Sequence, residues 1–223
     1  MADAAAAARD RRELAWQFNL LPSLYCHDSW LPAGLPDTVR ATRHDPGALC
    51  HRQLSPWLLA RCRVAERFEF GFDDAARRLA LLDGAALSRL APALGLLVRR
   101  EALRRTVHGP ALAGVRQACG LESLGFVVMS AGRFSLHGPS GGALDPDGLA
   151  ALPLLGRQLL TELASHGQWA VAGRLRLKFG RGTSPRAPRP AGWIADGDAP
   201  ALMSWVADQL IPKVVPQWAW LFC

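Results

Sequence analysis

The stretch LSRLAPALGLLVRREALRR at residues 87–105 has the clearest helical periodicity of the chain. Its apolar side chains recur at steps of three or four residues, at Leu87, Leu90, Leu94, Leu97 and Val98. Because an α-helix turns once every 3.6 residues, this spacing predicts one apolar face. The opposite face carries Arg89, Arg99, Arg100, Arg104 and Arg105. Pro92 predicts a kink or a fresh start within the run, since proline lacks a backbone N–H.

Capping residues predict further helices on both sides of this run. The signals are Pro56, Asp73 with Asp74, Asp145 with Pro146, and Asp198. After Pro146, leucines recur on one stripe to about residue 167. Gly84 is placed to end the helix that follows Asp74.

Other segments are less regular. Residues 1–15 are rich in alanine and predict a loosely held helical extension. Residues 16–32 mix aromatic side chains with prolines, which indicates an irregular segment. Arginine, proline and glycine at residues 181–192 predict a mobile loop. Residues 121–131 and 174–179 stay open between helix and strand, although residues 174–179 alternate like a half-buried strand with a cationic outer face.

The composition is that of a globular protein. Half of the residues are hydrophobic and 20% are charged. A chain of 223 residues is long enough to bury a large core without disulfides. Together with the helical patterns, this predicts one compact, mainly α-helical domain over residues 16–223, with room for minor short β-strands.

Nothing in the chain indicates export or a membrane span. Acidic and basic residues stand at residues 3–13, where a signal peptide needs an apolar run. The longest apolar run, at residues 90–98, is half of the roughly 18 residues that a transmembrane helix needs. The five cysteines are an odd number without a CxxC pair. A reducing cytoplasm is therefore the expected location.

The charge is basic and unevenly distributed. The net charge is +7, and all 26 basic residues except Lys178 and Lys213 are arginines. Residues 40–116 carry a net charge of +7, and residues 171–192 carry six basic groups without an acid. Such segments favour an acidic partner, whether nucleic acid, anionic lipid or an acidic protein face. A GC-rich genome, which tends to encode arginine together with Ala, Gly and Pro, explains the same excess without any partner.

No motif predicts catalysis, a cofactor or a metal. Residues 138–142 match GxSxG around Ser140, but the strand before the serine and the helix directly after it are missing from the pattern. Cys26 with His27 and Cys50 with His51 are adjacent pairs, whereas zinc ligands usually stand two to four residues apart. No phosphate-binding glycine motif is present. We therefore expect no enzyme, no bound cofactor and no metal.

The basic helical run and the terminal aromatics are the candidate binding residues. We predict that partners contact Arg99, Arg100, Arg104, Arg105, Trp218 and Trp220. Trp16, Trp30, Trp218 and Trp220 lie near the two ends of the sequence, which suggests one shared aromatic cluster. The alternative hypothesis is a helical nucleic-acid-binding protein that uses the two basic segments.

Four segments stand out along the chain: WQFNLLPSLYCHDSWLP at residues 16–32, the arginine-bearing helices around residues 87–105, RLRLKFG at residues 174–180 and IPKVVPQWAWLF at residues 211–222. Together they resemble the SctK family (YscK and PscK type) of the bacterial type III secretion injectisome. The resemblance covers residues 16–222. Residues 1–15 and 181–192 depart from the family pattern.

The resemblance implies a non-enzymatic adaptor of the cytoplasmic sorting platform, required for protein secretion and virulence. SctK proteins link the cytoplasmic domain of the inner-membrane ring subunit SctD to the SctQ–SctL pods that carry the ATPase. The expected partners are therefore SctD and SctQ, with SctL and the ATPase reached indirectly. The expected location is the cytoplasmic face of the inner membrane, with no nucleic acid bound and no membrane insertion.

Overall fold

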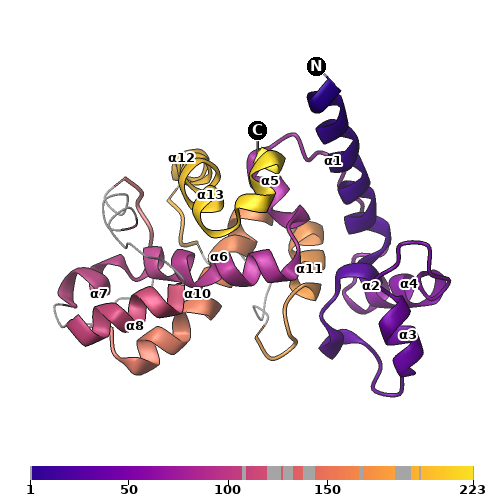
Figure 1. The fold of residues 1–223 in the computed structure, drawn as a ribbon, viewed down its shortest axis with the longest axis horizontal. Helices are drawn as coiled ribbons and strands as arrows, with labels where there is room; N and C mark the ends of the chain where they lie inside the picture. Colours follow the sequence, from indigo (N-terminus) through magenta and orange to yellow (C-terminus); the bar gives the residue numbers. More distant parts are fainter. Residues whose placement is uncertain are drawn as a thin grey trace.

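The computed structural model describes residues 2–106, 109–119, 127, 133–137, 144–165, 168–183, 192–195 and 197–222, which are mainly helical (Figure 1). The elements are α1 (Ala2–Leu20), α2 (Pro22–Tyr25), η1 (Asp28–Trp30), α3 (Asp37–Thr42), α4 (His51–Arg61), α5 (Ala75–Arg78), η2 (Leu79–Leu81), α6 (Gly84–Val98), α7 (Arg100–Arg105), α8 (Gly109–Cys119), α10 (Pro146–Ser165), α11 (Trp169–Leu177), α12 (Asp198–Trp205), η3 (Val206–Leu210), α13 (Ile211–Val214) and η4 (Pro216–Phe222). The mainly α-helical prediction is confirmed. Within the described residues, β-structure is limited to one isolated antiparallel bridge between Leu136 and Ile194.

The centre of the fold is the contact between α6 and α10. A Cβ atom added at Gly156 of α10 would lie 1.7 Å from the carbonyl oxygen of Ala91 in α6. A Cβ atom at Gly95 of α6 would lie 2.0 Å from the carbonyl oxygen of Leu152 in α10. The two helix backbones therefore touch where both helices carry glycine, and any side chain there would force them apart.

Helix α6 is more buried than its periodicity predicts. Every residue from Leu90 to Val98 is buried, so the second half of the helix has no solvent-facing side. The helix also continues through Pro92, so the predicted fresh start there is wrong. It begins at Gly84 because the Asp83 side chain accepts a hydrogen bond from the backbone N–H of Ala86. Gly84 thus opens α6 rather than ending the preceding helix.

The capping predictions have mixed outcomes. Asp74 and Asp145 accept hydrogen bonds from Ala76 N (3.0 Å) and Gly148 N (2.7 Å), as N-cap side chains do. Asp198 does not cap α12, since Gly197 holds the N-cap position and the Asp198 carboxylate accepts from Ser135 N.

Two predictions that were based on prolines in the first 62 residues are wrong. Residues 16–20 are helical rather than irregular, because α1 runs unbroken to Leu20. Pro56 lies inside α4, which begins five residues earlier at His51. A proline within a helix removes one hydrogen bond, and burial of neighbouring side chains such as Leu58 offsets that loss.

Residues 22–62 form what we call the N-terminal lobe, which contains α2, η1, α3 and α4 and lies at the lower right of Figure 1. Its apolar centre is a small cluster, separate from the large core, made of Cys26, Trp30, Leu31, Leu58 and Leu177. Leu177 belongs to α11, so this helix connects the lobe to the rest of the molecule.

Residues 174–179 were left open between helix and strand. They form the end of α11 and the turn after it. The predicted cationic outer face is wrong, because Arg174 is fully buried and Lys178 is 6% exposed. Three other predicted features lie outside the described residues: residues 121–131 except Val127, Ser140, and residues 184–191 of the predicted loop.

Candidate partner interface

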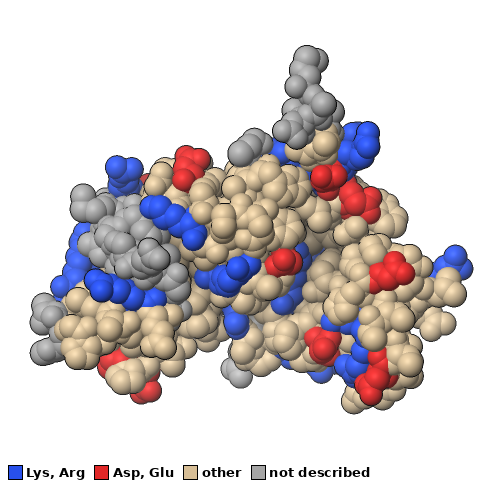
Figure 2. Space-filling model, in the orientation of Figure 1, with Lys and Arg blue, Asp and Glu red and all other residues tan. Residues whose placement is uncertain are grey.

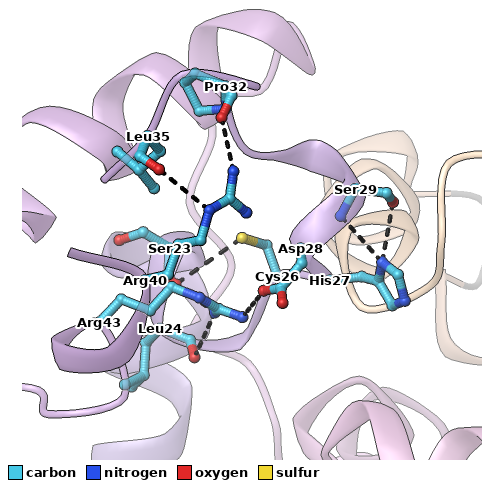
Figure 3. Close-up of polar contacts among 10 residues, drawn as sticks. All are labelled: Ser23, Leu24, Cys26, His27, Asp28, Ser29, Pro32, Leu35, Arg40 and Arg43. Atoms are coloured by element: carbon cyan, nitrogen blue, oxygen red, sulfur yellow. Dashed lines mark hydrogen bonds and ion pairs between the residues drawn. The ribbon is translucent and has the colours of Figure 1, made fainter. Parts of the chain in front are cut away.

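Many arginines of the basic segments are used inside the fold. Figure 3 shows two of them in the N-terminal lobe, where they bind carbonyl groups of α2 and of the segment between η1 and α3. Arg40 donates to Pro32 O (3.0 Å) and Leu35 O (3.2 Å). Arg43, which is 4% exposed, donates to Ser23 O (3.0 Å) and forms an ion pair with Asp28. Arg43 satisfies the carbonyl of the buried Ser23, and both guanidinium groups are engaged within the lobe.

The adjacent cysteine–histidine pairs have structural roles. The His27 ring accepts from Ser29 N and so caps η1 (Figure 3), while burial raises the pKa of Cys26 to about 12. The buried His51 ring bonds to Ser23 Oγ at 2.6 Å through Nδ1 and to Asp45 O at 2.8 Å through Nε2. Among the described residues, no group of three His, Cys, Asp or Glu side chains is arranged to hold a metal ion.

Two buried cations of α11 and its end bind backbone carbonyls of other segments, and Lys178 contacts both the large core and the N-terminal lobe. Arg174 donates to Val64 O at 3.1 Å. The Lys178 ammonium donates to Ala80 O at 2.6 Å and lies 4.9 Å from the ring centre of Tyr25. Desolvation by burial lowers the pKa of Lys178 to about 7, against an opposing effect of Asp83.

Arg99 and Arg100 lie at the junction between α6 and α7. Both are half-buried, because the helical run breaks at Arg99 instead of continuing to residue 105. Arg100 donates to Phe134 O at 2.6 Å and is 3.7 Å from the carboxylate of Glu101. Arg100 therefore ties α7 to the segment around Phe134.

Arg104 and Arg105 are the exposed members of the predicted arginine set. Arg104 forms an ion pair with Glu101 at 2.8 Å, one helical turn away. Figure 2 shows Lys and Arg side chains gathered over the left end of the molecule, where Figure 1 places α7. This end has a basic surface, although two of the four predicted arginines, Arg99 and Arg100, are half-buried.

Trp218 and Trp220 lie in η4, beside α5 and away from α7 (Figure 1). Their rings stack with centres 6.3 Å apart, and both side chains are half-buried against the large core. Trp30 instead belongs to the small cluster of the N-terminal lobe. The hypothesis of one terminal aromatic cluster is therefore wrong, and the six predicted partner-binding residues form two separate areas.

A further surface, which the sequence analysis missed, lies between α4 and α11. Two adjoining hollows of about 360 and 490 Å³ share Glu66, Arg67 and Trp169 as lining residues. We call their union the Trp169 groove, and its other lining residues are Ala60, Arg63, Ala65, Phe68, Glu69, Gln168 and Ala170.

Three aromatic side chains at or next to this groove are exposed to solvent. Phe68 is 49% exposed, Phe70 is 58% exposed and Trp169 is 38% exposed. The guanidinium of Arg67 lies 5.0 Å from the ring centre of Trp169. Exposed aromatic groups bordered by arginine are typical of protein-binding surfaces.

The comparison with protein families decides the class of the chain. Residues 14–217 match the family model described as YOP proteins translocation protein K (YscK). The chain belongs to the YscK family. YscK-family proteins are protein translocation components of type III secretion, and the resemblance to the SctK family is thereby confirmed. No curated protein and no solved structure gives a significant match to the chain.

The family match covers the Trp169 groove and three of the four resembling segments in full, and it ends one residue before Trp218. The segment CRVAERFEFG at residues 62–71 mixes arginine, glutamate and phenylalanine. This mixture of charged and aromatic residues is the sequence signal that could have predicted the groove. In this YscK-family chain, no helix within the described ranges combines the length and the apolar character that a membrane span requires.

Proposed function

We propose that this YscK-family chain is a non-enzymatic adaptor of the type III secretion sorting platform. It links the cytoplasmic domain of the inner-membrane ring subunit SctD to SctQ, and through SctQ to SctL and the ATPase. The observation that carries the proposal is the family match over residues 14–217, which includes nearly all described helices. The adaptor works at the cytoplasmic face of the inner membrane without inserting into it.

The shape of the molecule supports a linking role. An adaptor needs two surfaces that do not overlap, so that one partner can stay bound while the other docks. Here α7 lies at one end of the molecule (Figure 1), whereas the Trp169 groove is lined by the end of α4, the segment after it and the start of α11. Charge on α7 would guide the encounter, whereas exposed aromatic groups would supply most of the binding energy.

Affinity purification of the tagged chain from secreting cells tests the proposal. We expect SctD and SctQ to co-purify, and their absence from the purified material would overturn the adaptor role. Charge reversal in Arg104→Glu with Arg105→Glu should weaken co-purification of one partner, because both side chains are exposed. Arg89→Glu, on an exposed position of α6, is the control. Partner yields equal to wild type in the double variant would remove α7 from the interface.

The alternative function, nucleic-acid binding, has its own test. Binding of duplex DNA should fall steeply as salt rises, because phosphate contacts release counterions. The absence of any electrophoretic shift at low salt would exclude this alternative.

A further inference from the structure

We propose that the Trp169 groove binds an acidic segment of a partner protein that also carries apolar side chains. This proposal rests on the adaptor role proposed above, because it assigns one of the adaptor's contacts to a particular surface. Four properties of the groove support it: a fixed shape, an excess of positive charge, exposed apolar anchors and a strained arginine at its edge.

Hydrogen bonds from buried side chains fix the backbone that lines the groove. The fully buried side chain of Asn19 bonds to both backbone groups of Glu69, accepting from its N–H at 2.8 Å and donating to its carbonyl. Arg174 holds Val64 O at 3.1 Å from the other side. A surface that is ordered before binding loses little conformational entropy when a partner docks.

The charge of the groove favours an anionic ligand. Arg63 and Arg67 are exposed lining residues. Of the two acidic lining residues, Glu69 is paired with Arg77 at 3.2 Å and accepts from Gly71 N at 2.7 Å. Glu66 is therefore the remaining exposed carboxylate against two arginines. A carboxylate-rich peptide would meet a net attraction here.

The aromatic groups favour a peptide over a nucleic acid. Single-stranded nucleic acids bind by stacking bases on open aromatic faces. Arg67 already lies over Trp169, and Arg174 lies 5.6 Å from the ring centre of Phe68. Phe68 and Phe70 are still 49% and 58% exposed and can receive aliphatic side chains.

Arg63 occupies a position where the fold prefers glycine. Its φ is +57°, in the left-handed region. Arg63 N donates to Ala60 O and Val64 N donates to Leu59 O, the two hydrogen bonds of a Schellman helix end. Most helices that end this way place glycine at this position. The arginine costs backbone strain here but projects a cation into the groove, which is consistent with a binding role.

The test uses the full chain and fluorescein-labelled peptides of about twelve residues in which leucine or phenylalanine alternates with aspartate or glutamate. Matched peptides carry lysine or serine at the acidic positions. We expect the acidic peptides to bind best by fluorescence anisotropy, and to bind more weakly at 500 mM than at 50 mM NaCl. Arg63→Gly and Arg67→Ala should each reduce the affinity by about fivefold or more, whereas Arg89→Ala should retain it.

Arg63→Gly separates binding from folding. Because glycine adopts a positive φ without strain, its unfolding midpoint should equal or exceed that of wild type while its peptide affinity falls. Three results would overturn the proposal: acidic peptides that bind no better than lysine or serine peptides, equal affinity in wild type and Arg63→Gly, or tighter binding of a single-stranded oligonucleotide that Trp169→Ala abolishes.

The peptide result can be distinguished from the fate of the adaptor role. If SctD and SctQ co-purify with wild type and acidic peptides do not bind, the groove proposal fails alone. If neither subunit co-purifies but acidic peptides bind, the adaptor role fails and the groove keeps its ligand class.

Discussion

The α6–α10 pair and the N-terminal lobe are built by different interactions. The pair excludes water with leucines and brings two backbones together at Gly95 and Gly156. The lobe has a small apolar cluster, and it is held by arginine hydrogen bonds to carbonyl groups, most of all those of Arg43 (Figure 3). The comparison teaches that arginine is a structural residue in this protein, so its count overstates the charge available to partners.

Substitution at the helix crossing should have the largest effect on stability. Gly156→Ala places a Cβ atom 1.7 Å from Ala91 O, and backbone cannot yield as a flexible side chain can. We expect a loss of about 3 kcal/mol or more in the free energy of unfolding, measured with denaturant. Gly114→Ala in α8 is the control, since its Cβ meets a leucine methyl group at 3.3 Å. Equal stability of the two variants would contradict a backbone contact between α6 and α10.

Removal of Arg43 should loosen the lobe and spare the core. Arg43→Met leaves the carbonyl of Ser23 buried without its donor, at an expected cost of about 2 kcal/mol. Hydrogen exchange should accelerate in residues 22–62 and stay unchanged in α6. Asp28→Asn is the milder comparison, because the Asp28 side chain is 63% exposed. Faster exchange throughout α6 would show that the two regions unfold together.

Substitution of Trp218 tests whether η4 is part of the large core or only covers it. A fully buried tryptophan replaced by alanine costs about 3–5 kcal/mol. Trp218 is half-buried, so we expect Trp218→Ala to lower the free energy of unfolding by about 1–2 kcal/mol. A loss as large as that of Gly156→Ala would mean that η4 is part of the core rather than a cover on it.

The effect of Lys178 on stability should depend on pH. Its pKa is about 7 in the folded protein, against roughly 10.4 in an unfolded chain. Between these values the unfolded state binds more protons, so stability rises with pH, by at most about 1.4 kcal/mol per pH unit. We expect the difference in unfolding free energy between wild type and Lys178→Met to grow from pH 7 to pH 9. A constant difference would contradict the low pKa.

The pH comparison is internally controlled. The buried thiols of Cys26 and Cys119 have pKa values raised to about 12, and they lower stability at alkaline pH by the opposite linkage. Both thiols are present in wild type and in Lys178→Met, so their effect cancels in the difference.

Local patterns predicted the parts of the fold that depend on near neighbours. The leucine spacing in residues 87–98 and the caps at Asp74 and Asp145 act within one or two helical turns, and they were predicted correctly. Residues 174–179 could not be assigned to helix or strand, because alternation over six residues fits a strand as well as a helix whose polar side chains are buried. The Trp169 groove was missed because its lining comes from α4, the segment after it, and α11.

Contiguous residues were enough to predict the helical class, several helix starts and the family resemblance, because periodicity, caps and motifs are local properties. Which cations are buried, where the glycines meet and which aromatic groups stay exposed follow only from the folded chain. Arg174 illustrates the difference. Its hydrogen bond to Val64 O joins residues that are 110 positions apart in the sequence, and only folding brings that carbonyl within reach. A charged group can be buried only when such partners bind it, and a local sequence pattern does not show partners that lie far away in the chain.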